Sequence, residues 1–86
     1  MNRTVQELLR RELIRRLNRY ALIDRRFCQK YGMDFESFRR QGTVEREGYR
    51  FDVESDYCDW EMAVTSMEAL SKRLSDLEEE DVRMYR

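Results

Sequence analysis

The densest group of side chains that could do chemistry is acidic. It consists of Asp52, Glu54, Asp56, Asp59 and Glu61. Carboxylate oxygens suit divalent cations, and pairs of metal ions held in this way hydrolyse phosphodiesters. The group lacks the ordered spacing of a calcium-binding loop and has no lysine or general base beside it. Acidic charge at the start of a helix, and pairing with a neighbouring helix, explain it more simply. We therefore expect no metal ion and no cofactor.

Nucleophilic catalysis is also not predicted. The chain contains no histidine, which removes the commonest general base and a common metal ligand. Its serines therefore lack the usual activating partner. Cys28 and Cys58 form no CxxC pair that would indicate a zinc or redox site. We expect a non-enzymatic protein in which both cysteines are reduced and half-buried.

The arginines are the third group of side chains that could bind or react, and arginine outnumbers lysine fifteen to two. One interpretation is a ridge on the first helix that follows a nucleic-acid backbone. The other is a solvated face whose guanidinium groups pair with acids of another helix. The net charge of −1 and the lack of a recognised nucleic-acid motif favour the second interpretation. The candidate nucleic-acid face consists of Arg11, Arg15, Arg19 and Arg26.

The charges are divided between the two parts of the chain. Residues 1–50 hold 13 basic and 7 acidic residues, whereas residues 51–86 hold 4 basic and 11 acidic residues. This asymmetry is typical of a basic binding surface beside an acidic segment, or of two segments that pair with each other.

A long helix is predicted over about residues 5–31. Thr4 and Glu7 have the spacing of a capping box at its start, and Gly32 is suited to end it. Asp24 interrupts the apolar stripe, and a flank of Ile14, Ala21 and Cys28 widens it. The stripe itself consists of Leu9, Leu13, Leu17, Tyr20, Phe27 and Tyr31.

The middle of the chain is predicted to hold a short helix at about 35–40 and an extended connector over 43–54. Asp34 is a suitable N-cap for the short helix. Tyr49, Phe51 and Val53 alternate with charged residues, which is the period of a strand. A single strand needs a partner, so the connector would pair across a dimer or with another protein.

A second long helix is predicted over about 56–79, capped by Ser55 or Asp52, with a frayed tail at 81–86. Its heptad seam continues from Trp60 through Ala63, Met67, Leu70, Leu74 and Leu77. The expected fold is therefore all-α: one helical domain over 1–86, built as an antiparallel hairpin of two long helices. Two helices cannot enclose both apolar stripes, so a homodimeric bundle or a partner protein is expected to complete the core.

Tyr57 and Trp60 begin the last helix among the aspartates. Aromatic residues at this spacing usually pack in a core. A large aromatic ringed by charge is also the usual composition of an interface anchor. The sequence leaves both interpretations open.

Two segments, RRFCQKYGMDFESF (25–38) and GYRFDVESDYCDWEMA (48–63), resemble small prokaryotic helical proteins of toxin–antitoxin-type two-gene cassettes. The resemblance implies an antitoxin-like protein that neutralises a partner toxin, encoded by an adjacent gene, by direct binding. The acidic group with Tyr57 and Trp60 would then face a basic toxin surface. The alternatives are a self-assembling homodimeric module and an RNA-binding adaptor that uses the arginine face. Arginines interrupt every apolar run, so we expect no membrane span and a cytoplasmic protein.

Overall fold

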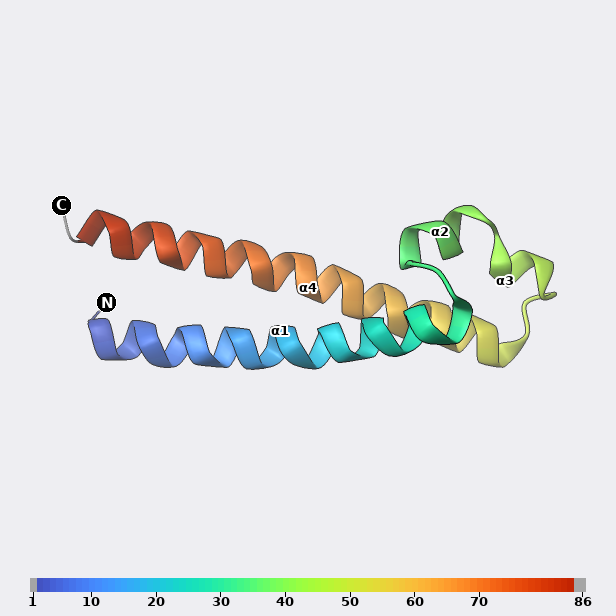
Figure 1. Ribbon diagram of the computed structural model, residues 1–86, viewed down its shortest axis with the longest axis horizontal. Coiled ribbons are helices and arrows are strands. Elements are labelled where there is room, and N and C mark those ends of the chain that lie inside the picture. Colours follow the sequence, from blue (N-terminus) through green and yellow to red (C-terminus); the bar gives the residue numbers. More distant parts are fainter. Residues whose placement is uncertain (1, 85–86) are drawn as a thin grey trace.

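The computed structural model describes residues 2–84, with side chains described for residues 2–80. Two long helices run antiparallel, and two short helices lie at the end opposite the termini (Figure 1). The molecule is elongated, with extents of 56 × 19 × 17 Å. The fold is the predicted all-α hairpin. Its helices are α1 (Arg3–Tyr31), α2 (Phe35–Arg40), α3 (Thr43–Arg46) and α4 (Phe51–Met84).

The ends of α1 follow from local capping. Asn2 is the N-cap, and its Oδ1 accepts a hydrogen bond of 2.8 Å from the backbone N–H of Val5. The predicted capping box is therefore wrong, because Thr4 lies inside the helix and Glu7 pairs with Arg3 at 3.7 Å. Gly32 ends α1 as predicted: its φ of 69° is left-handed, a conformation that costs glycine little.

The extended connector predicted over 43–54 is wrong. Residues 43–46 form α3, and α4 begins at Phe51, so only a short turn at 47–50 separates them. Strand alternation would place Phe51 and Val53 on the same face, yet Phe51 is 85% exposed and Val53 is 3% exposed. In a helix, Val53 instead shares a face with Tyr57 and Trp60, four and seven residues later. Burial of the face that contains these three residues stabilises the helix over the strand.

The bounds of α4 also differ from the prediction at both ends. The proposed caps, Ser55 and Asp52, lie inside the helix. The carboxylate of Asp52, in the first turn, interacts favourably with the positive N-terminal end of the helix dipole. The helix continues to Met84, beyond the predicted end at about residue 79. Residues 85–86 of the predicted tail lie outside the described residues. Within residues 2–84, no helix has the length and apolar character needed to cross a membrane.

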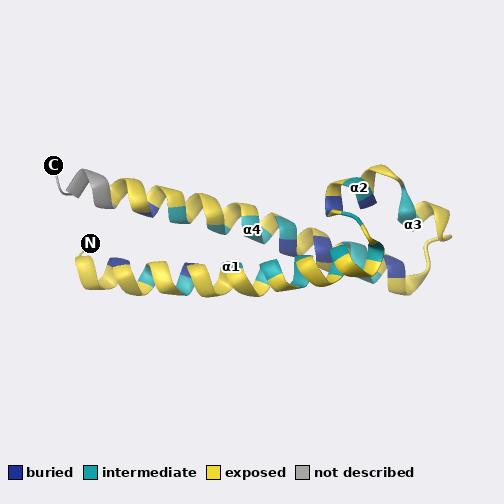
Figure 2. Cartoon of the chain, viewed as in Figure 1, coloured by how far each residue is buried: buried dark blue, intermediate teal, exposed yellow. Residues whose placement is uncertain are grey.

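The core lies at the closed end of the hairpin, where α2 folds onto α1 and α4 (Figure 2). Trp60 and Phe38 are fully buried, and Phe35 and Val53 are nearly so. Asp34 positions α2 by accepting a hydrogen bond of 2.8 Å from the backbone N–H of Ser37, as the sequence predicts. The residues packed around this core include Phe27, Cys28, Tyr31, Tyr57 and Val64.

Beyond the closed end, few of the apolar residues between α1 and α4 are fully buried. Leu13, Ala63 and Leu77 are buried between the long helices, together with the polar Gln6. The other residues of the predicted seam beyond the closed end are half-buried, which is the most that two helices provide. These half-buried residues are Leu9, Leu17, Tyr20, Met67, Leu70 and Leu74.

Candidate functional site

Trp60 is the centre of the core and is not available as a surface anchor. Its side chain is fully buried. Its ring centroid lies 5.0 Å from that of Phe38, 5.4 Å from that of Phe35 and 5.5 Å from that of Phe27. Of the two interpretations that the sequence left open, core packing is therefore the correct one for Trp60.

Asp24 holds the indole of Trp60. Its Oδ1 accepts a hydrogen bond of 2.7 Å from the indole N–H, across the interface between α1 and α4. A buried indole N–H needs such an acceptor, because an unpaired polar group in a core is costly. This contact explains why an acidic residue interrupts the apolar stripe of α1.

Tyr57 is half-buried and packs against α2, with ring centroids 5.4 Å from Phe35 and 6.2 Å from Phe38. Burial, followed by the nearby Glu61 carboxylate, raises the pKa of the Tyr57 phenol. Tyr57 therefore contributes mainly to the boundary of the core.

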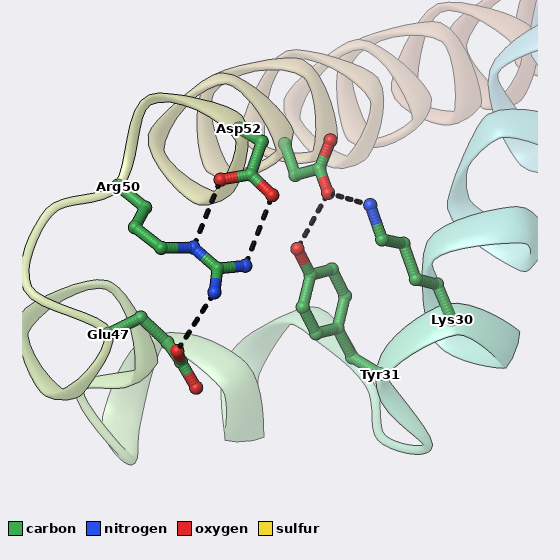
Figure 3. Close-up of polar contacts among 6 residues, drawn as sticks. Lys30, Tyr31, Glu47, Arg50 and Asp52 are labelled. Atoms are coloured by element: carbon green, nitrogen blue, oxygen red, sulfur yellow. Dashed lines mark hydrogen bonds and ion pairs between the residues drawn. The ribbon is translucent and has the colours of Figure 1, made fainter.

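Asp56 is used inside the molecule. Its Oδ2 accepts hydrogen bonds from Lys30 Nζ at 2.5 Å and from the Tyr31 hydroxyl at 2.6 Å, so it ties the start of α4 to the end of α1 (Figure 3). Burial, and then this hydrogen bond, raise the pKa of Tyr31. Asp56 is accordingly a structural residue rather than part of a free acidic surface.

Asp52 is also paired within the chain. Arg50 donates from Nε at 3.2 Å and from Nη2 at 3.1 Å to its two carboxylate oxygens, and Arg50 Nη1 lies 3.7 Å from Glu47 (Figure 3). The hydrogen bonds from Arg50 lower the pKa of Asp52. This network closes the turn that leads into α4.

The acidic surface predicted from residues 52–61 is therefore not a single surface. Glu54, Asp59 and Glu61 are exposed, as is Asp52 although it pairs with Arg50. Glu54 and Glu61 are seven residues apart and share one face of α4, while Asp59 lies on another. Within the side chains that the structure describes, no three acidic or cysteine groups gather closely enough to hold a metal ion.

A groove between α2 and α4 is the strongest candidate site. It has a volume of about 650 Å³. Its apolar part comes from one flank of α4 and from Phe35 of α2. The sequence contained its signals, an apolar flank on α4 and acids around α2, but not the fold that brings them together. The lining residues are Asp24, Asp34, Phe35, Glu36, Val64, Met67, Glu68 and Ser71.

The rim of the groove is acidic. Hydrogen bonds from the backbone and side chain of Ser37 lower the pKa of Asp34, so this carboxylate is ionised at neutral pH. Glu36 accepts two hydrogen bonds from Arg39, at 3.0 and 3.1 Å. Glu68 is exposed beside the groove. The site thus presents an apolar floor with acidic groups around it.

The arginine face of α1, defined as Arg11, Arg15, Arg19 and Arg26, is exposed. Arg15 pairs with Glu12, one turn away on the same helix. The other three have no hydrogen bond or ion pair within the described part of the chain. The expectation that these arginines pair with acids of the other long helix is therefore wrong.

The two cysteines occupy different surroundings and are not joined by a disulfide. Cys28 is half-buried as predicted, and burial, followed by the nearby Asp24, raises the pKa of its thiol. Cys58 is exposed, because it lies on the outer face of α4, so the prediction of half-burial is wrong for this residue.

Comparison with known proteins finds no matching family model, no similar curated protein and no similar solved structure.

Proposed function

We propose that this chain is a non-enzymatic, antitoxin-like protein-binding module that neutralises its partner by holding a basic amphipathic helix of that partner in the groove beside α2. The observation that carries the proposal is the combination of an apolar floor and an acidic rim, at Phe35, Val64 and Met67 and at Asp34 and Glu68.

The apolar floor suits a helical segment. On α4 the lining residues extend from Val64 to Ser71, which is about two helical turns, or about 10 Å. An amphipathic helix binds such a groove through anchors three, four or seven residues apart. Apolar anchors at this spacing would cover Val64 and Met67, which the hairpin leaves half-buried.

The acidic rim selects the charge of the partner. Asp24, Asp34, Glu36 and Glu68 lie around the groove, although Arg39 offsets part of the charge of Glu36. A segment rich in lysine or arginine would complement this rim and associate faster at low salt. A toxin that acts on nucleic acid has basic surfaces of this kind, which supports the antitoxin-like form of the proposal.

The first experiment is to co-express the chain with the protein encoded by the adjacent gene and to measure the molar mass of the purified material by light scattering. We expect a hetero-complex of defined stoichiometry. A homodimer with nothing bound would contradict the proposal and support self-assembly through the half-buried seam instead.

Charge reversal at the rim locates the interface. Glu68→Lys is expected to weaken the hetero-complex about tenfold, mainly through slower association, because it places a cation beside a basic partner. The matched control is Asp59→Lys, an exposed acid of α4 outside the groove. Titration calorimetry on both variants would show the difference.

Both substitutions are at exposed positions, so urea unfolding should change by less than about 0.5 kcal/mol in either variant. Equal weakening by both, or a larger effect of Asp59→Lys, would place the interface outside the groove and contradict the proposal.

A further inference from the structure

We propose that the arginine face of α1 binds the phosphodiester backbone of a nucleic-acid duplex. This site is separate from the groove, since none of its four arginines lines that groove. The inference goes beyond partner binding and does not depend on it.

The position of the arginine face on α1 makes it accessible. Successive residues are rotated by about 100° around a helix, so Arg11 and Arg15 lie about 160–200° from Leu13. Leu13 is 3% exposed and packs between the long helices, which places these arginines on the side away from α4. Arg19 and Arg26 follow at spacings of four and seven and continue the same face.

Three of the four arginines of this face are not neutralised by the protein. Arg11, Arg19 and Arg26 have no ion pair within residues 2–80, and Arg15 is paired with Glu12 at the edge of the face. Between Glu12 and Asp34, α1 and the following turn contain a single acid, Asp24, which is directed to Trp60. Guanidinium groups exposed in this way are available to phosphate oxygens.

The dimensions fit a nucleic-acid backbone. Arg11 to Arg26 spans about 22 Å along the helix axis, with the first three arginines one turn, about 6 Å, apart. Duplex DNA carries one negative charge per about 1.7 Å of its axis, so several phosphates face a surface of this length. Four arginines can therefore engage up to four phosphates.

The face favours a duplex over a single strand. Proteins that bind single strands combine basic charge with aromatic side chains on which bases stack. The exposed large apolar residues between Arg11 and Arg26 are the aliphatic Ile14 and Leu22. Tyr20 and Phe27, the aromatic residues next to Arg19 and Arg26 in the sequence, are both half-buried. This arrangement can contact the phosphodiester backbone but offers no exposed aromatic ring on which a base could stack.

The test is fluorescence anisotropy of the full chain with labelled duplex DNA and duplex RNA of about two helical turns, at salt concentrations from about 50 to 200 mM. Binding is expected with at least one duplex. The logarithm of the association constant should fall against that of salt concentration with a slope of about −3 to −4. The DNA and RNA arms identify which duplex is preferred.

Two triple variants with equal net charge then localise the site. Arg11→Gln/Arg19→Gln/Arg26→Gln should weaken binding at least tenfold at low salt and reduce the slope by about 3. Arg40→Gln/Arg46→Gln/Arg73→Gln removes three exposed arginines elsewhere and should leave the slope unchanged. Circular dichroism would verify that both variants are folded.

The proposal is overturned if neither duplex binds, if both triple variants weaken binding equally, or if a single strand binds more tightly than either duplex. Anionic lipid vesicles of phosphatidylserine and phosphatidylcholine serve as a further probe. Binding to these vesicles without binding to either duplex would assign the arginine face to a membrane surface and would also overturn the proposal.

Discussion

Trp60→Ala is expected to lower the free energy of unfolding by about 3–5 kcal/mol. The side chain is fully buried among the rings of Phe27, Tyr31, Phe35 and Phe38, so its removal leaves a cavity at the centre of the core. A small domain has a total stability of only about 5–15 kcal/mol, so a large fraction of the molecules would unfold under mild conditions. Urea titration followed by circular dichroism measures the change.

The matched control for Trp60→Ala is Phe51→Ala, which removes a large aromatic side chain from the same helix. Phe51 is 85% exposed, so its substitution should change the free energy of unfolding by less than about 0.5 kcal/mol. Equal stability of the two variants would show that Trp60 is not the centre of the core.

Asp24→Ala is expected to lower the free energy of unfolding by about 1–3 kcal/mol, because the buried indole N–H of Trp60 loses its acceptor. The loss should depend on the indole. In a Trp60→Phe background there is no N–H to satisfy, and Asp24→Ala should cost much less. A double-mutant cycle on these two positions, measured by urea unfolding, gives the coupling free energy.

If Asp24→Ala lowers the free energy of unfolding equally in both backgrounds, Asp24 does not stabilise the fold through its hydrogen bond to Trp60. Asp76→Ala provides a control for removal of a carboxylate from a long helix, since Asp76 is exposed on α4. Its substitution should have an effect within about 0.5 kcal/mol.

Local signals made the two long helices, the short α2 and two of their boundaries predictable from the sequence. Apolar periodicity defined the faces of α1 and α4, Gly32 marked a left-handed stop, and Asp34 marked an N-cap. These features depend on residues within one or two turns of each other. Asn2 was missed as the cap of α1 because Thr4 and Glu7 give a similar local signal that begins two residues later.

The connector was mispredicted because two periodicities overlap in it. Tyr49, Phe51 and Val53 alternate like a strand, while Val53, Tyr57 and Trp60 repeat like a helix. The segment is helical because the helix buries both Val53 and Trp60 against α2. That outcome depends on tertiary packing, which a short sequence window does not contain.

The candidate site was only partly predictable for a related reason. The sequence identified an acidic group but not which acids the fold uses internally: Asp56 binds Lys30 and Tyr31, and Asp52 binds Arg50. The groove needs α2 to fold against α4, and no local pattern reports that contact. The arginine face shows the opposite case, since the exposure of its four arginines follows from their spacing along α1, and only their pairing depended on the fold.

The groove and the arginine face carry opposite charges and have no residue in common. A chain with both sites would hold a basic protein segment beside α2 and a nucleic-acid duplex along the outside of α1. The variants proposed for the two sites separate these activities, because Glu68→Lys leaves the arginines intact and the arginine substitutions leave the groove intact.

The most direct test of partner binding beside α2 is amide hydrogen exchange of the chain alone and in complex with the protein encoded by the adjacent gene. Slower exchange in the complex is expected at residues 34–36 and 64–71, which line the groove. Slower exchange confined to residues 52–61, or to the half-buried seam around Leu9, Leu17 and Leu74, would contradict the groove as the binding site.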